Sequence, residues 1–155
     1  MSKEQEEGIE QDFDILIFDA FNSDAIPIHL LTHKAFILYA DSLAEDGLIA
    51  VHVSNRFFNL MHIVARQGME VGLESLRIRS NGAPRKYESL PSKWVLLSRN
   101  GDRIAKLAQA LPQAYEDMGL KAARMAVIHS KREALMHIRL WTDNFSNLLN
   151  QLKPL

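Results

Sequence analysis

The first part of the chain alternates short apolar runs with an amphipathic stretch. Phe13 to Phe18 (FDILIF) is nearly continuous in apolar residues and ends at Asp19, a pattern typical of a strand covered on both faces, as in a parallel sheet. Leu48 to Val53 (LIAVHV) predicts a second buried strand. Between them, His29 to Ala44 carries apolar residues at steps of three and four, which predicts a helix ended by Asp46-Gly47. A strand, helix and strand of this length form a right-handed unit, so the two strands are expected to be parallel.

The second part of the chain predicts two more helices and two more strands. These are a helix over Phe57–Val71, strands over Leu73–Arg79 and Lys93–Ser98 separated by an exposed polar loop over Ser80–Ser92, and a helix over Ile104–Leu111. Pro112 is expected to interrupt that last helix, because proline removes a backbone donor. The apolar residues from Ala122 to Leu140 are scattered and predict no particular element.

Composition restricts the chemistry more than the fold. The chain has 155 residues, 47% of them hydrophobic and 24% charged, which suits one globular domain with its own core. The net charge of -1 gives no general attraction to nucleic acid or to an anionic membrane. The absence of cysteine excludes disulfides, thiolate metal sites and cysteine nucleophiles. Residues 1–11 are polar and acidic and are interpreted as a solvated arm. Because no apolar run is long enough to span a bilayer, a cytoplasmic protein is expected.

Four segments carry a resemblance to a known family. FDILIFDAFNSDAIP (Phe13 to Pro27) resembles a segment typical of spermidine-synthase-like proteins, the polyamine aminopropyltransferases and their relatives. These proteins share the fold of methyltransferases that use S-adenosylmethionine. The similarity continues over His29 to Leu60 and returns at PSKWVLLSR (Pro91 to Arg99) and WTDNFSNLL (Trp141 to Leu149).

The resemblance implies a partial fold. In the family, the strand matching Asp14 to Asp19 is the fourth of seven, and the first three strands carry the glycine-rich loop that holds the cofactor. The segment before Phe13 is too short for one βαβ unit, and no GxGxxG-like loop occurs in the sequence. We therefore expect a Rossmann-like (methyltransferase-type) α/β half-fold over residues 12–155: parallel strands, a terminal antiparallel hairpin at one sheet edge, and helices on both faces.

The candidate catalytic residues are Asp19 and Asp24. In the aminopropyltransferases a pair of aspartates after this strand holds the attacking amine and helps to deprotonate it, and carboxylates suit both tasks. Asp19 matches the first of the pair; Asp24 is the nearest equivalent of the second, with two extra residues between them. Alternatively, Asp24 caps the following turn and Asp19 fixes the loop by hydrogen bonds. By the same resemblance, Ala20 and Phe21 are expected to contact the cofactor, S-adenosylmethionine or its decarboxylated form.

Two further polar residues are candidates for substrate binding. Asn55 follows the second predicted strand and is expected to face the same cleft as Asp19. Asp143 lies in the segment that resembles the family's active-site mouth, although it also fits the cap of a short helix. His52, within the second strand, is interpreted as a satisfied core histidine. His29 and His33 have the spacing of metal ligands on a helix, but no HExxH motif or carboxylate cluster accompanies them, and no metal is expected.

Three functional interpretations follow. The first is a spermidine-synthase-like aminopropyl or methyl transferase that is not active alone, because the cofactor loop is absent. The second is a non-catalytic module that pairs through its exposed sheet edge, either as a homodimer or with a separate chain carrying the amino-terminal half. The third is a remodelled product that folds without a catalytic role. A polyamine is the expected ligand of the first interpretation, and neither nucleic acid nor a membrane is an expected partner of any of them.

Overall fold

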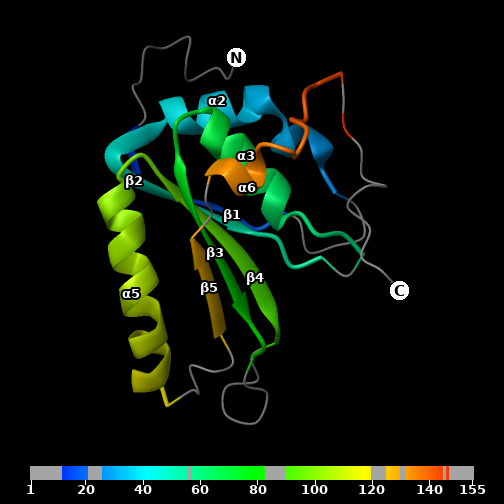
Figure 1. Ribbon diagram of the computed structural model, residues 1–155. Helices are drawn as coiled ribbons and strands as arrows, with labels where there is room; N and C mark the ends of the chain where they lie inside the picture. The colour runs from blue at the N-terminus through cyan, green and yellow to red at the C-terminus, as the bar shows by residue number, and fades with distance from the viewer. Residues whose placement is uncertain are drawn as a thin grey trace.

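The computed structural model describes residues 12–20, 26–55, 57–82, 90–119, 125–129, 132–144 and 146. Their five strands form one open sheet in the order β1-β2-β4-β3-β5 (Figure 1). The strands are β1 (Phe13–Phe18), β2 (Leu43–His52), β3 (Glu74–Ser80), β4 (Ser92–Ser98) and β5 (Met125–His129). β1 and β2 are parallel, as predicted, whereas the pairs β2/β4, β4/β3 and β3/β5 are antiparallel. The protein is therefore an α/β protein with a mostly antiparallel open sheet. The parallel β1–β2 pair and the antiparallel β3–β4 hairpin were predicted, whereas the fifth strand was not.

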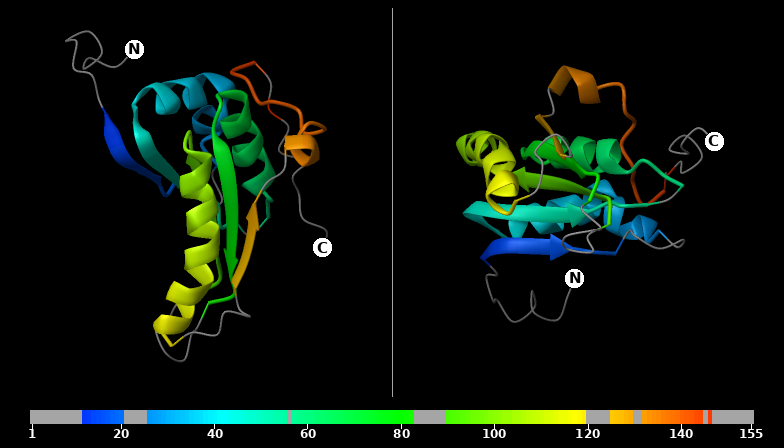
Figure 2. Two further views of the ribbon diagram at one scale, coloured as in Figure 1. Left: turned by 60° about the vertical axis from the view of Figure 1, so that its left-hand side comes forward. Right: turned by 90° about the horizontal axis from the view of Figure 1, so that it is seen from below.

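Helices lie against both faces of the sheet, but they cover the two faces unequally. The helical elements are the 3-10 turn η1 (Ile28–Leu31) and the helices α2 (His33–Asp41), α3 (Met61–Glu70), α5 (Gly101–Asp117) and α6 (Arg132–Leu135). On one face, η1, α2, α3 and α6 contribute to the larger core together with side chains of β1, β2 and β4. On the other face, α5 packs on β3, β4 and β5, and Figure 2 shows it opposite α3 across the sheet.

The unequal cover leaves β1 exposed on one face, which corrects the expectation that this apolar run is buried on both sides. Leu16 and Phe18 pack against the larger core, but Ile15 and Ile17 face the other way and are 55% and 63% exposed. The reason is the position of α5, which packs mainly on β3, β4 and β5 and whose apolar cluster includes no β1 side chain among the described residues. Among the described strands, β1 has β2 as its one neighbour, so its far edge is open.

The first helix is shorter than predicted and the strand after it is longer. Thr32 starts α2 by accepting the Ala35 N–H on its hydroxyl at 3.4 Å, and β2 already begins at Leu43. Gly47 is thus inside β2 instead of ending a helix. A Cβ at Gly47 would lie 2.7 Å from the carbonyl oxygen of Phe13, so glycine permits the close approach of β1 at the irregular start of the pair.

The carboxyl-terminal part also departs from the pattern. α5 continues through Pro112 to Asp117, and its last turn is held by a 2.8 Å hydrogen bond between Tyr115 Oη and Ser80 Oγ of β3. β5 pairs with the open side of β3, so the β3–β4 hairpin is not at the edge of the sheet, contrary to expectation. Because β5 and α6 are short, they left no periodic signal in residues 122–140.

Candidate functional site

The carboxyl ends of the two parallel strands bring three polar side chains into one chain of hydrogen bonds. Asp19 directly follows β1, His52 is the last residue of β2, and Ser54 lies two residues beyond. Asp19 Oδ1 is 2.6 Å from Nδ1 of His52, and Nε2 of the same ring is 2.6 Å from Ser54 Oγ. The carboxyl ends of parallel strands are where open α/β sheets bind ligands. The cluster Asp19–His52–Ser54 is therefore the candidate site.

The register of β1 and β2 explains why these residues meet. Phe18 is paired with Val51, and both side chains enter the larger core. One residue further along each strand, Asp19 and His52 lie side by side and face the opposite side of the sheet, because successive side chains alternate. Ser54 lies two residues beyond His52 and accepts the backbone N–H of Lys93 on its hydroxyl oxygen at 2.7 Å.

Burial differs along the cluster. The His52 side chain is 15% exposed and stacks on Trp94 of β4, its cross-strand partner, with ring centroids 4.6 Å apart. The Asp19 side chain is 57% exposed. His52 is thus held in orientation by three contacts, while more than half of the Asp19 side chain is exposed.

The other predicted site residues are placed as follows. Asp24 and Phe21 lie outside the described residues, and Ala20 is half-buried directly after Asp19. Asn55 is buried, and its Oδ1 accepts the N–H groups of Phe57 and Phe58 at 2.9 Å each, so it shapes the turn before α3. Asp143 is exposed in a turn, two residues after Trp141, whose carbonyl oxygen accepts the His33 N–H at the start of α2.

The sequence interpretation missed Ser54 and the role of His52. His52 is satisfied by hydrogen bonds, as predicted for a core histidine, but its partners are the candidate carboxylate and a serine. The signal was present in the pattern: Asp19 and His52 each come at the end of an apolar run, and Ser54 has the same strand parity as His52. Only the pairing register, which the pattern does not contain, makes the three residues neighbours.

A cavity of about 250 Å³ opens beside Ser54. Ser54 and Asn55 line it from the end of β2, Arg79 and Ser80 from β3, and Ser92 and Lys93 from β4. Arg79 and Lys93 are the charged residues among its described lining residues.

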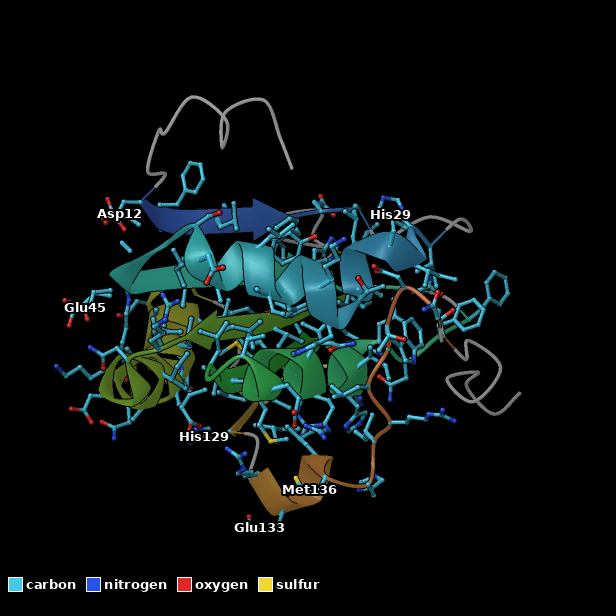
Figure 3. The ribbon with its side chains drawn as sticks, turned by 90° about the horizontal axis from the view of Figure 1, so that it is seen from above. Asp12, His29, Glu45, His129, Glu133 and Met136 are labelled. Carbon is cyan, nitrogen blue, oxygen red and sulfur yellow. The ribbon has the colours of Figure 1, made fainter. Side chains whose placement is uncertain are left out.

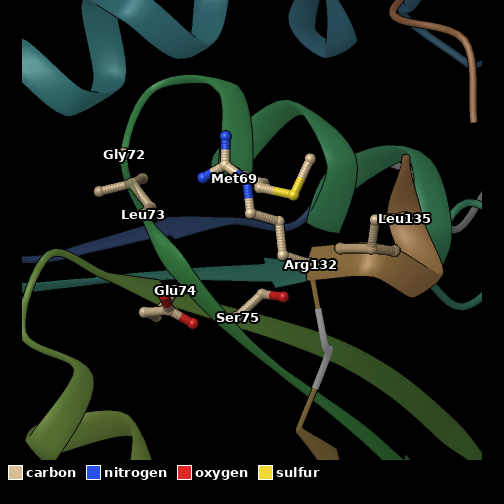
Figure 4. A pocket seen from close by; sticks show the side chains of 7 residues that line it. All are labelled: Met69, Gly72, Leu73, Glu74, Ser75, Arg132 and Leu135. Carbon is tan, nitrogen blue, oxygen red and sulfur yellow. The ribbon is translucent and has the colours of Figure 1, made fainter.

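A second, smaller hollow of about 90 Å³ lies at the other end of β3, between the α3–β3 turn and α6 (Figure 4). Met69, Leu73 and Leu135 supply its apolar lining, and Glu74 and Arg132 its charged groups. It is too small for a drug-sized ligand, for which pockets of about 300 Å³ or more are usual. We assign it no chemistry.

His62 of α3 is a half-buried base away from the candidate site. Arg77 Nη1 donates to its Nδ1 at 2.7 Å, so this ring nitrogen acts as an acceptor. Burial lowers the pKa of His62 from its ordinary value of 6.5, and the charges of Arg77, His137 and Arg79 lower it further. In the unfolded chain the same residue binds a proton more readily.

This shift predicts an acid-sensitive fold. The pKa of His62 is lower in the folded chain than in the unfolded chain, where it is about 6.5. Its contribution to the free energy of unfolding is therefore fully present above pH 6.5 and is lost as the pH falls through the folded-state pKa. Urea midpoints measured from pH 7.5 to pH 5 are expected to fall more steeply for the wild-type protein than for His62→Gln. His29→Gln, a change at an exposed histidine, is the control and should leave the pH dependence unchanged. Parallel pH curves for wild type and His62→Gln would contradict this assignment.

Two other classes of site receive no support from the described ranges. Among the described residues, no three His, Cys, Asp or Glu side chains are grouped so as to hold a metal ion. No helix in the same part of the chain has the length and apolar character needed to cross a membrane.

The chain matches no protein-family model and no curated protein. The fold and site thus define an open-sheet α/β protein with a polar cluster at the end of its parallel strand pair.

Proposed function

We propose that the chain is the amine-binding half of a spermidine-synthase-like transferase, in which Asp19, oriented by His52, binds a polyamine and accepts its proton. The observation that carries this proposal is the 2.6 Å contact between Asp19 and His52 at the carboxyl ends of adjacent parallel strands. It is supported by the resemblance of residues 13–27 to the family segment that contains the amine-binding aspartates.

The chemistry of the cluster suits an alkylammonium ligand. A carboxylate is both a counter-ion for the ammonium group and an acceptor of its proton. His52 holds one oxygen of Asp19 and orients the carboxylate, so that the exposed side of the group faces the amine. A neutral amine left by proton transfer is the nucleophile that an aminopropyl or methyl transfer requires.

The fold supports a methyltransferase-type half-fold of the Rossmann-like kind. A parallel strand pair joined through a helix, followed by an antiparallel hairpin beside the second strand, is what the resemblance implies. The described residues do not by themselves fit S-adenosylmethionine or its decarboxylated form. Ala20 is the one described residue assigned to the cofactor, and no described glycine-rich loop opens at a strand end. We therefore assign no step to the cofactor, and expect a separate segment or chain to bind it.

Replacing Asp19 by asparagine is expected to weaken polyamine binding by about ten- to a hundredfold. A hydrogen bond to a charged group contributes about 1.5–3 kcal/mol, and each 1.4 kcal/mol is a factor of ten in affinity. Isothermal titration with putrescine and with spermidine, on wild type and Asp19→Asn, measures the change. Titration with 5′-methylthioadenosine tests nucleoside binding in the same series.

Asp12→Asn is the matched control for the Asp19 variant. It removes the same charge from the exposed residue before β1, and Figure 3 shows Asp12 at the beginning of that strand, at the end opposite to His29. Its affinity for polyamines should remain within about twofold of wild type. No saturable binding to the wild-type protein, or equal losses in the two variants, would refute an amine site at Asp19.

The open edge of β1 favours a second candidate function, that of a dimerisation module. Ile15 and Ile17 leave an apolar strip on the uncovered sheet face beside an edge that pairs with no described strand. Strands with such edges pair readily with another chain. A second copy fits best by symmetry, since the same strand of two copies can pair about a twofold axis.

Ile17→Lys is expected to turn a dimer of the wild-type chain into a monomer, because it places a charge in the apolar strip without touching the core. Light scattering of both proteins at equal concentration measures the mass. Ile37→Lys, a change at an exposed isoleucine on α2, is the control and should leave the dimer intact. A monodisperse wild-type monomer would exclude this function and leave a chain carrying the cofactor-binding half as the partner to test.

A further inference from the structure

We propose that Ser54 is a nucleophile for acyl transfer, activated by His52 and oriented through Asp19, on a small ester that enters the adjacent cavity. The arrangement of carboxylate, imidazole and hydroxyl is that of a serine hydrolase triad, which is recognised by geometry and not by chain order. Both contacts are 2.6 Å, which is within the range expected for a nucleophile with its base and a base with its orienting group.

The hydrogen bonds select the productive tautomer of His52. The ionised carboxylate of Asp19 can only accept, so Nδ1 of His52 carries the proton that joins them. In the neutral imidazole, Nε2 is then an acceptor. Ser54 Oγ already accepts the Lys93 N–H, and its own proton is directed to Nε2 of His52. His52 is therefore arranged to remove the hydroxyl proton as a general base.

The proposed reaction balances without a cofactor. Ser54 Oγ attacks the ester carbonyl carbon while its proton moves to Nε2 of His52. The bond from carbon to the leaving alkoxide breaks, and the alkoxide takes that proton and departs as an alcohol. Water then attacks the acyl-serine and gives a proton to His52, and the acid departs as Ser54 Oγ recovers its proton from the ring.

The cavity indicates the class of ester. Ser54 lines a space of about 250 Å³, into which Arg79 and Lys93 also face as lining residues. Because two basic residues and no acidic residue line it within the described part of the chain, an acyl group that carries a carboxylate is favoured over a neutral one. The volume limits the substrate to a small acid.

A fluorophosphonate probe tests the nucleophile directly. The intact chain is incubated with the probe, and the labelled residue is identified by mass spectrometry of its peptides. We expect a single phosphonate on Ser54, no labelling of Ser54→Ala, and labelling at least about a hundredfold slower in His52→Gln. Asp19→Asn should slow labelling by about tenfold or more, because the ring is no longer held in its tautomer.

Ser42→Ala is the control, because Ser42 lies at the opposite end of β2 from Ser54 and its hydroxyl donates to the Leu38 carbonyl oxygen. It should be labelled at the wild-type rate. Hydrolysis of mono-4-nitrophenyl succinate should exceed that of 4-nitrophenyl acetate, and Arg79→Gln should reduce the difference. Either of two results would overturn the proposal. One is a folded wild-type protein whose Ser54 stays unlabelled, and the other is labelling of His52→Gln at the wild-type rate.

The test is separable from that of amine binding. Ser54→Ala keeps Asp19 and His52, so polyamine titration of this variant reports on the proposed function alone. A wild-type chain that binds polyamines but is not labelled by the probe removes only the acyl-transfer proposal, and a wild-type chain that is labelled on Ser54 but binds no polyamine removes only the transferase proposal.

Discussion

Replacing Trp141 by alanine is expected to lower the free energy of unfolding by about 3–5 kcal/mol, which is the usual range when a buried aromatic residue is truncated in a core. Trp141 is 1% exposed and belongs to the larger core between the sheet, α2 and α3. It is also one of the few residues that attach the segment after α6 to the body of the protein. Its carbonyl oxygen accepts the His33 N–H at 2.8 Å, which fixes this segment to the start of α2.

Urea unfolding followed by far-ultraviolet circular dichroism measures this loss without relying on tryptophan fluorescence. Trp141→Phe keeps an aromatic ring and should cost clearly less than alanine, because less volume is removed. Leu90→Ala is the surface control, since Leu90 is 77% exposed. A loss below about 1 kcal/mol in Trp141→Ala would mean that the carboxyl-terminal segment does not contribute to the core.

Replacing Gln67 by methionine is expected to lower the free energy of unfolding by about 1–3 kcal/mol, although it keeps the size of the side chain and adds apolar surface. Gln67 is fully buried in α3, and its Nε2 donates to the carbonyl oxygens of Leu31 at 2.9 Å and of Trp141 at 2.8 Å. The Trp141 oxygen keeps the His33 N–H as a donor, but the Leu31 oxygen loses this amide donor, and an unsatisfied buried group costs about 1–3 kcal/mol. The amide therefore joins three segments that are far apart in the sequence.

Gln113→Met on α5 is the matched control, because Gln113 is exposed and its amide donates only to Asp117 on the same helix. Its effect should stay within about 0.5 kcal/mol. Chemical unfolding of both variants at one pH supplies the comparison. Equal stability of Gln67→Met and wild type would show that the two carbonyl groups find other donors.

Much of the fold could be predicted from apolar periodicity. The strands β1, β3 and β4 and the helices α2, α3 and α5 lie where the pattern placed them, with boundaries shifted by several residues. The start of α3 differs from the prediction because a side chain binds backbone N–H groups that the periodicity had assigned to the helix. Asn55 draws the N–H groups of Phe57 and Phe58 into a turn, so α3 begins at Met61 and not at Phe57.

The position of Asp19 directly after β1 was predicted, but its partners His52 and Ser54 were not. Asp19 was identified because a carboxylate at the end of an apolar run lies at the ligand-binding end of a strand. Its neighbours depend on register, and a shift of one residue would have placed His52 on the opposite face. The roles assigned to Asp24 and Phe21 fall outside the described residues and stay predictions, as do those of Ala20, Asn55 and Asp143.

The sequence by itself determined the α/β class and the parallel β1–β2 pair, because these follow from local periodicity and from the handedness of a strand–helix–strand unit. Tertiary structure alone decided which strands are antiparallel, which face of β1 is left open, and which polar residues become partners. The sequence predicts Ile15 and Ile17 to be core residues, but both are exposed, because α5 packs on β3, β4 and β5 and leaves this face of β1 uncovered. Long-range pairing of this kind depends on how whole elements pack, which no single segment encodes.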